Sequence, residues 1–341
     1  MERYERLKGG LFGLIIGDAL GVPYEFHSAV EIPPFHEIEM EPPKDFARTY
    51  QVRPGTWSDD SAQALCLLDS LLECGGFDLE NFAGKLMAWL NNGLWAVDGQ
   101  VFDCGIQTHA SLSRFAAGYP AKECGFTRPD GKGNGALMRV LPVVLYNVGD
   151  DEELIQAAQE QCLITHGHIC NQMCCALYCL WARRIIAGLE IRRAFEAAVA
   201  GLKEYYQDRE MEDYLFELEQ LLRDGNFSGG GYVIDTMRST MHLLFTYKDY
   251  ESVVKEAIRL GNDTDTTAAV AGGLAGLYYG YSSIPTRWLS GLRGRKEVEK
   301  IFERVLMDER IDRKRHGIDR SDLYFINTCT WLWTVTNSRT E

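Results

Sequence analysis

Segments of helical periodicity follow one another along most of the chain, and this pattern limits the possible folds more than any other feature. Apolar residues recur at intervals of three and four in stretches such as 58–74 and 210–222, which is the spacing of one helix face. No stretch shows sustained alternation of apolar and polar residues between turn signals, as half-buried strands would. The sequence therefore predicts an all-α fold with little or no sheet.

The expected helices are separated by short glycine- or proline-containing turns. They cover residues 3–21, 58–74, 79–90, 105–117, 151–165, 168–187, 193–205, 210–222, 232–245, 251–260 and 266–280. The proline-rich segment 31–54 has no periodic pattern and predicts a long surface loop, of the kind that serves as a lid or as a variable insertion. No linker divides the chain, so we expect one compact domain over residues 1–310. The remaining residues, 311–341, end in an aromatic stretch and are expected to dock on that domain.

Composition narrows the class of protein. Of the 341 residues 46% are hydrophobic, enough for a sizeable core, and the net charge of −14 argues against a general nucleic-acid binder, which would carry a basic patch. The ten cysteines form no C-x-x-C pair and favour free thiols in a reducing compartment. No signal peptide or stretch of transmembrane length is apparent. We expect a soluble cytoplasmic monomer that does not bind membranes.

The stretch Leu260–Ala268 carries two carboxylates, Asp263 and Asp265, among hydroxyl side chains at the start of an expected helix. One interpretation is a turn in which an Asp or Thr caps the helix, since those residues are favoured at that position. The other is half of a site for a hard metal ion, because Mg²⁺ and similar ions take carboxylate and hydroxyl oxygens. Spacing alone leaves both interpretations open.

A second acidic turn, Ser58-Asp59-Asp60-Ser61, stands at the head of another expected helix. Capping and a favourable helix dipole again offer a purely structural explanation. Adjacent carboxylates facing a second acidic pair would repel one another unless a cation lay between them. The two turns together therefore point to a binuclear site for hard metals. An EF-hand does not fit, because the glycine and the distal glutamate of that loop are missing.

Four further features are candidates for a site. The loop Gly131–Gly135, expected to open onto a helix, is either a phosphate cradle or an ordinary glycine turn; it matches neither a Walker A motif nor a Rossmann fingerprint. His166 lies in a Thr-His-Gly-His stretch with too few further ligands for zinc, which favours contact with a bound ligand. Glu25 follows a Gly-rich helix at once, and Asp103 lies in a loop; each carboxylate fits a site role or a solvated position.

These motifs occur in an order that resembles the ADP-ribosylglycohydrolase family, which includes dinitrogenase reductase-activating glycohydrolases and ADP-ribosyl hydrolases. The matching stretches are Gly13–Glu25, Gly55–Leu72, Asp103–Thr108, Gly133–Pro142, Thr165–His166, Gly230–Asp235 and Gly261–Gly280. The resemblance excludes most of the proline-rich loop and the segment after about Leu306. Several motifs in one order are far more specific than any one of them.

The resemblance implies a single orthogonal bundle of α-helices with two divalent cations, Mg²⁺ or Mn²⁺, at the bottom of a cleft. By motif, the metal ligands would be Ser58, Asp59, Asp60, Asp263, Asp265 and Thr266. The catalytic residues would be Glu25, Asp59, Asp103 and Asp265, with Asp103 near the distal ribose. The nucleotide would be bound by Gly133, Asn134, Gly135, His166 and Tyr232, with the glycine loop facing the phosphates.

The implied activity is hydrolysis of the glycosidic bond between ADP-ribose and an acceptor, with arginine of a modified protein as the first expectation. Serine-linked ADP-ribose, O-acetyl-ADP-ribose and ADP-ribosylated nucleic-acid ends are alternative substrates. Two other classes stay open: a non-catalytic ADP-ribose-binding protein on the same fold, and a hydrolase that cuts the pyrophosphate. A binding protein is expected to lose metal carboxylates, whereas this chain keeps four.

Overall fold

The computed structural model describes residues 1–146, 148–223 and 225–307, and this part of the chain is all-α, as predicted. The helices are α1 (Arg3–Gly21), α2 (Asp59–Cys74), α3 (Leu79–Asn92), α4 (Ile106–Ala116), α5 (Pro142–Leu145), α6 (Asp151–Glu160), α7 (Ile169–Ile186), α8 (Ile191–Asp208), α9 (Glu212–Leu222), α10 (Val233–Thr246), α11 (Tyr250–Arg259), α12 (Thr264–Tyr279), α13 (Thr286–Gly291) and α14 (Arg295–Met307). In the described ranges, extended pairing is limited to two isolated bridges, Ser28–Gly261 and Gly133–Tyr232.

Most expected helices are present within a few residues of their expected ends. The helix expected over 151–165 stops at Glu160, and the rest of that stretch is turn. Helices α13 and α14 were not anticipated. The loop 31–54 holds one short 3-10 helix, η2 (Phe35–Glu37). The predicted extension 311–341 lies outside the described residues.

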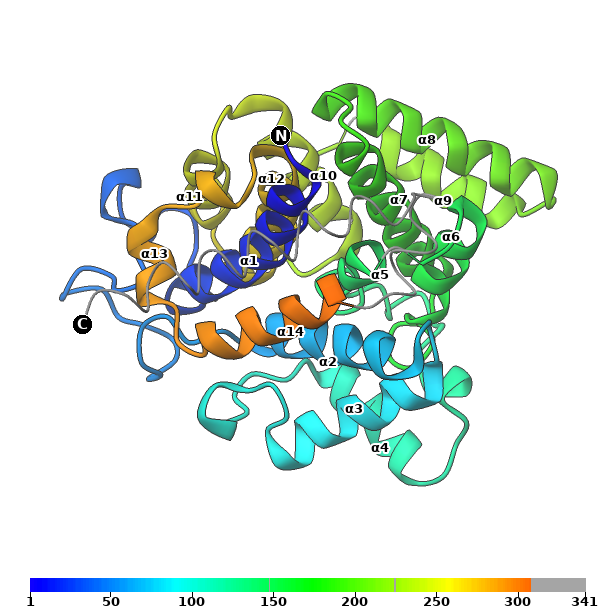
Figure 1. Cartoon of the computed structure of the whole chain (residues 1–341), viewed down its shortest axis with the longest axis horizontal. Helices are drawn as coiled ribbons and strands as arrows, with labels where there is room; N and C mark the ends of the chain where they lie inside the picture. Colours follow the sequence, from blue (N-terminus) through cyan, green and yellow to red (C-terminus); the bar gives the residue numbers. More distant parts are fainter. Residues whose placement is uncertain (147, 224, 308–341) are drawn as a thin grey trace, which may run out of the picture.

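Helices α1 and α12 run antiparallel and in close contact through the middle of the molecule (Figure 1). A row of glycines on α1 makes this approach possible. A Cβ on Gly13 would lie 2.3 Å from the carbonyl oxygen of Gly272, and one on Gly17 would lie 2.2 Å from that of Ala268. Side chains larger than hydrogen therefore cannot fit there, which explains the small residues that the sequence concentrates in both helices.

The close pairing also sets the position of two loops. Since the helices are antiparallel, the end of α1 lies beside the start of α12, where a Cβ on Gly21 would lie 2.4 Å from the Cα of Asp265. The segment that follows α1 is then joined to the turn before α12: Phe26 N–H donates to Asn262 O at 2.7 Å, and Asn262 N–H donates to His27 O at 2.6 Å. Glu25 and the acidic turn 263–265 are thereby brought together.

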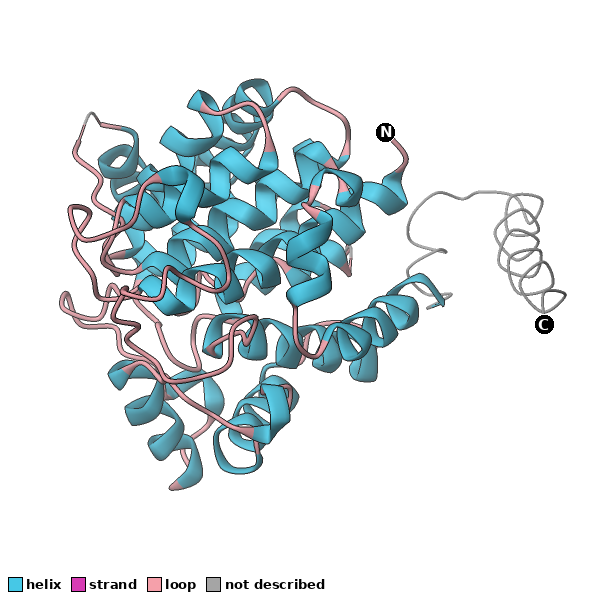
Figure 2. Ribbon diagram, turned by 90° about the vertical axis from the view of Figure 1, so that its left-hand side faces the viewer, coloured by secondary structure: helices cyan, strands magenta, loops and turns pink. Residues whose placement is uncertain are grey.

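The remaining helices surround this pair. Helix α7 is buried over most of its length and packs against α6, α8, α9 and α12, while α14 lies along α2, with α3 and α4 on the outer side of α2 (Figure 1). The longer loops gather along one side of the body (Figure 2). The nine cysteines in the described ranges are free thiols, as expected. None of the helices in this part of the chain combines the length and apolar character of a membrane span.

Candidate active site

A cavity of about 500 Å³ opens where the segment after α1 meets the N-termini of α2 and α12. Its size is within the range of small-molecule sites. The described residues that line it are Glu25, Phe26, Asp59, Asp60, Asp103, Gly105, Ile106, Gln107, Thr108, Gly133, Asn134, Gly135, Met138, His166, Gly231, Asn262, Asp263 and Thr266. Most of the residues predicted to form a site thus share one cavity, although they come from six separate segments.

Carboxylates form the floor of this cavity. Oxygen atoms of Glu25, Asp263 and Asp265 lie within 4.8 Å of one another, and Asp60 Oδ2 is 3.4 Å from the hydroxyl of Thr266. Three buried oxygens, Glu25 Oε2, Asp60 Oδ1 and Asp265 Oδ2, have no hydrogen-bond partner within the described structure. Buried charged groups are normally paired or bound to metal, so this donor set fits hard divalent cations.

The electrostatics lead to the same conclusion. Burial, with the charges of Asp265 and Asp103 beside it, raises the pKa of Glu25 to about 12. Burial and neighbouring carboxylates also raise the pKa values of Asp59, Asp60 and Asp265 well above the ordinary value for aspartate. Like charges so close cannot all be ionised without compensation. A cation in the cluster would supply that compensation.

The first acidic turn is held by a residue that sequence reasoning did not single out, Asp18 of α1. Its fully buried carboxylate accepts hydrogen bonds from the N–H of Ser58 (2.9 Å), the N–H of Ser61 (2.9 Å) and the hydroxyl of Ser61 (2.5 Å). Burial raises the pKa of Asp18 to about 6, against the opposing effect of these hydrogen bonds. Asp18 therefore fixes the start of α2. The feature of the sequence that could have identified Asp18 is the presence of an acidic residue inside an otherwise apolar helix.

The second acidic turn is held differently. Asp263 takes the N-cap position of α12. Burial raises the pKa of its carboxyl, and a hydrogen bond from the N–H of Thr266 in the first turn opposes that effect. Ser58 caps α2, accepting from Asp60 N–H at 3.3 Å. In addition, Asp263 Oδ2 accepts from Asn134 Nδ2 at 2.8 Å. Asn134 thus reaches from the glycine loop to the acidic turn, a contact that spacing did not predict.

A buried chain of polar side chains links Asp59 of the acidic floor to His166, which also lines the cavity. Gln63 Nε2 donates to Asp59 Oδ2 at 2.9 Å, and the side-chain amide oxygen of Gln63, Oε1, accepts from Arg139 Nη1 at 2.8 Å. Arg139 also donates to the hydroxyl of Thr165 at 2.7 Å, which lies 2.8 Å from His166 Nδ1. Arg139 is completely buried, and burial lowers its pKa to about 10. Burial, with the positive charge of Arg139, lowers the pKa of His166 to about 3, so this imidazole is neutral.

The glycine loop was expected to open onto a helix, and this expectation is wrong. Residues 135–139 form a run of turns, and the next helix, α5, has four residues and starts at Pro142. The glycines instead make room for His166: a Cβ on Gly135 would lie 2.7 Å from the imidazole Cε1, and one on Gly133 would lie 3.4 Å from Nε2. The loop is therefore shaped around the cavity wall rather than around a helix N-terminus.

Three predicted residues do not line the cavity. Asp265 belongs to the carboxylate cluster of the floor through its contact with Glu25 and Asp263. Ser58 adjoins the lining residue Asp59 and contacts Asp60. Tyr232 follows the lining residue Gly231, is 45% exposed and makes its side-chain hydrogen bond with Cys170. Asp103 faces the cavity, whereas Asp98, a second aspartate in the loop before α4, is exposed and paired with Arg293.

Comparisons of the sequence and of the structure with known proteins all lead to the same family. A family model described as ADP-ribosylglycohydrolase matches residues 1–315. ADP-ribosylarginine hydrolase Tri1 of Serratia proteamaculans is 29% identical over 304 residues, 89% of this chain and 80% of that protein. ADP-ribosyl-[dinitrogen reductase] glycohydrolase of Rhodospirillum rubrum is 29% identical over 296 residues, 87% of this chain and 93% of that protein. A solved structure described as an ADP-ribosylglycohydrolase-related protein complex has a TM-score of 0.72 at 30% identity and covers 89% of this chain and 98% of that one.

Proposed function

Because the chain belongs to the ADP-ribosylglycohydrolase family and is an enzyme of that class, we propose that it releases ADP-ribose from ADP-ribosylated arginine on proteins. The acceptor is taken from the relatives, since the Serratia proteamaculans protein is named an ADP-ribosylarginine hydrolase. The observation that carries the proposal is the buried carboxylate floor with its three unpartnered oxygens. A site that only bound ADP-ribose would have no need of so many destabilising buried charges.

The floor is where divalent cations would be held. Ser58, Asp59, Asp60, Asp263, Asp265 and Thr266 offer the carboxylate and hydroxyl oxygens that Mg²⁺ or Mn²⁺ prefers. Two such cations would supply fixed positive charge that orients ribose hydroxyls and water and stabilises charge developing at the anomeric carbon. The supporting residues Asp18 and Asn134 hold the two acidic turns in place by hydrogen bonds.

Glu25 and Asp103 are our candidates for proton transfer. Their side chains share a hydrogen bond and both line the cavity, so both are close to one reacting centre. Hydrolysis of a glycosidic bond commonly uses one carboxyl group to protonate the leaving group and another to activate water. We assign those two tasks to this pair, and Asp59 and Asp265 keep the sugar and the pair aligned from below.

The glycine-loop side of the cavity is the place for the nucleotide. Gly133, Asn134 and Gly135 present small side chains or backbone to the cavity, which lets a phosphate approach the main chain closely. The neutral imidazole of His166 offers a flat surface and a hydrogen-bonding nitrogen. Tyr232, which is half exposed and follows the lining residue Gly231, is our candidate contact for the base. Helix dipoles contribute less than the sequence implied, because no long helix begins at this loop.

Product analysis tests the proposal. The purified protein, supplied with Mg²⁺ or Mn²⁺, is incubated with peptides carrying ADP-ribose on arginine or on serine and with O-acetyl-ADP-ribose. We expect release of intact ADP-ribose, fastest from arginine. Release of AMP would show that the pyrophosphate is cut instead. Tight binding of ADP-ribose without turnover of any substrate would identify a binding protein. Faster turnover of the serine-linked or O-acetyl adduct would show that arginine is not the preferred acceptor.

A further inference from the structure

Three aromatic side chains stand in contact beside the acidic floor. Phe26, the residue after Glu25, lines the cavity and is 67% exposed. Its ring centroid lies 6.3 Å from that of Tyr50, which lies 5.2 Å from that of Phe102. These spacings are typical of interacting aromatic rings. The three residues form an aromatic wall of which Phe26 is the part that faces the cavity.

The structure holds Phe26 outward at some cost. Its φ of 62° places a bulky residue in the left-handed region, which is unfavourable for side chains of this kind. The backbone hydrogen bonds to the turn before α12 hold it there, and the ring remains largely exposed. A strained backbone and an exposed ring, both at the cavity, indicate that the ring contacts a ligand.

The loop 31–54 supports this wall and ties it to the reacting groups. The hydroxyl of Tyr50 donates a hydrogen bond to the carboxylate of Asp103. The neighbouring hydroxyl of Thr49 donates to the backbone carbonyl oxygen of Glu25 at 2.5 Å. The loop therefore contacts both members of the carboxyl pair, and the aromatic wall lies on the same side of the cavity as that pair.

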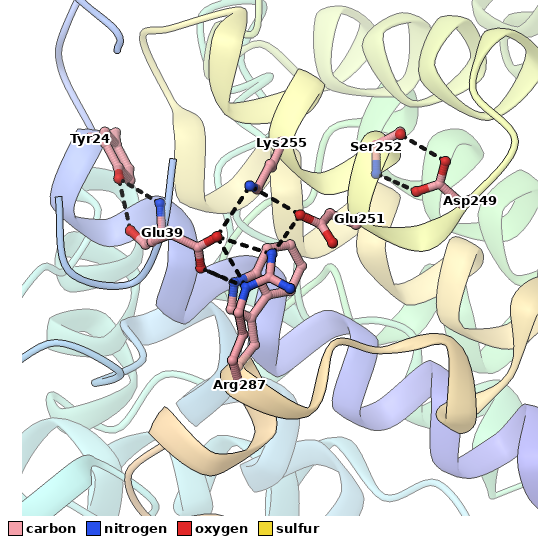
Figure 3. Close-up of polar contacts among 8 residues, drawn as sticks. Tyr24, Glu39, Asp249, Glu251, Ser252, Lys255 and Arg287 are labelled. Atoms are coloured by element: carbon pink, nitrogen blue, oxygen red, sulfur yellow. Dashed lines mark hydrogen bonds and ion pairs between the residues drawn. The ribbon is translucent and has the colours of Figure 1, made fainter. Parts of the chain in front are cut away.

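The same loop is fixed to the body by Glu39. Its carboxylate accepts from Lys255 Nζ at 3.2 Å, from Arg287 Nη2 at 3.0 Å and from the indole of Trp288 at 2.5 Å (Figure 3). The hydroxyl of Tyr24 donates to the Glu39 carbonyl oxygen at 2.7 Å. Lys255 is 2% exposed, so it is a buried cation held between carboxylates. These contacts anchor the middle of the loop to α11 and α13.

The charge of this part of the cavity selects the kind of ligand. Among the described lining residues there is no lysine or arginine, whereas Glu25 and Asp103 flank the aromatic wall. A cation over an aromatic face and next to carboxylates is favourable, and the flat guanidinium of arginine stacks on aromatic rings more readily than an ammonium does. We propose that Phe26 forms the acceptor subsite, on which the guanidinium of the modified arginine stacks while Asp103 and Glu25 act at its bond to ribose. The proposal rests on the proposed function.

Substitution of Phe26 separates this role from ADP-ribose binding. Phe26→Asn removes the ring while keeping a residue that tolerates the left-handed conformation, and Phe26→Tyr keeps the ring as the matched control. We expect Phe26→Asn to raise KM for an ADP-ribosylated arginine peptide by about fivefold, the effect of losing a cation–π contact of ~1 kcal/mol. Phe26→Tyr stays within about twofold of wild type, a difference of only ~0.4 kcal/mol. The inhibition constant of free ADP-ribose, which has no acceptor, is unchanged in both variants.

Two results would overturn the inference. KM unchanged in Phe26→Asn would show that the ring makes no contact with the acceptor. A parallel rise of KM and of the ADP-ribose inhibition constant would place Phe26 on the nucleotide instead. Failure of the wild-type protein to hydrolyse the arginine peptide is a different outcome, because it removes the proposed function itself. Circular dichroism of each variant confirms that the fold is retained.

Discussion

The floor and the rim of the cavity are built in different ways. The floor consists of carboxylates at the ends of α1, α2 and α12, and its geometry follows from backbone contacts such as the one between Gly13 and Gly272. The rim is the aromatic wall of Phe26, Tyr50 and Phe102, which come from loops; backbone hydrogen bonds to Asn262 hold Phe26, and the three rings contact one another through side chains. Backbone contacts between helices tolerate almost no added atoms. Contacts between rings of loop residues tolerate substitution better, because side chains can shift. We therefore expect changes to the floor to affect both stability and activity, and changes to the rim to affect activity alone.

The largest effect on stability is expected at the contact between α1 and α12. In Gly13→Ala the new Cβ meets a backbone oxygen at 2.3 Å, and because both sides are backbone the helices must move apart. We expect the free energy of unfolding to fall by roughly 3 kcal/mol, as for severe overpacking. Unfolding of the variant and of the wild type in denaturant measures this difference in the free energy of unfolding.

A glycine in α3 provides the matched control for that variant. A Cβ on Gly84 would meet nothing within 4 Å, so Gly84→Ala is expected to stabilise the protein by ~0.5–1 kcal/mol through helix propensity. Equal effects of the two substitutions would show that the close helix contact does not determine the position of the floor.

A smaller effect on stability and a clear effect on activity are expected at Asp18. In Asp18→Asn the amide nitrogen would face donors from Ser58 or Ser61, so at least one of the three hydrogen bonds is lost. Removing a partner from a buried polar group costs about 1–3 kcal/mol. Because these bonds orient the first acidic turn, affinity for Mn²⁺ is expected to fall by about 10–100-fold, as for other supporting groups of metal sites. Calorimetric titration with Mn²⁺ that gave wild-type affinity would contradict this role.

The smallest structural effect is expected on the rim. Tyr50→Phe keeps the ring contacts with Phe26 and Phe102 and removes the hydroxyl that donates to Asp103. We expect an unchanged melting temperature and KM, with kcat reduced by about tenfold, since a hydrogen bond to a charged group contributes ~1.5 kcal/mol or more. Steady-state kinetics measure the effect on kcat and KM, and a thermal melt measures the effect on stability. A lowered melting temperature with unchanged kcat would mean that Tyr50 serves the fold and not Asp103.

The same difference explains which parts of the molecule were predictable from sequence. Helical periodicity, the glycine- or proline-containing turns between segments and start signals such as Ser58 identified most helices, because these signals are local. The acidic turns at 58–60 and 263–265 were identified because unusual residue types stand at expected helix starts. The floor of the cavity therefore followed from local patterns, once two distant turns were assumed to meet.

The rest depends on contacts between distant segments that local patterns do not encode. Asp18 supports α2 from α1, Asn134 reaches across to Asp263, and Tyr50 lies in a loop without periodicity. The glycine loop was expected before a helix, but the segment after it curves around His166 instead. In each case the partner is far away in sequence, so neither propensity nor spacing carried the information.

The most direct measurement is the rate of ADP-ribose release from an ADP-ribosylated arginine peptide in three samples: wild type with Mn²⁺ or Mg²⁺, wild type after chelation, and Asp265→Asn with the metal. We expect the second and third rates to be lower by about 100-fold or more, a loss of ~2.7 kcal/mol in transition-state stabilisation. Adding metal back restores the chelated wild type, and excess metal does not restore Asp265→Asn. Unchanged rates in the chelated sample and in Asp265→Asn would contradict a metal-dependent role for the carboxylate floor.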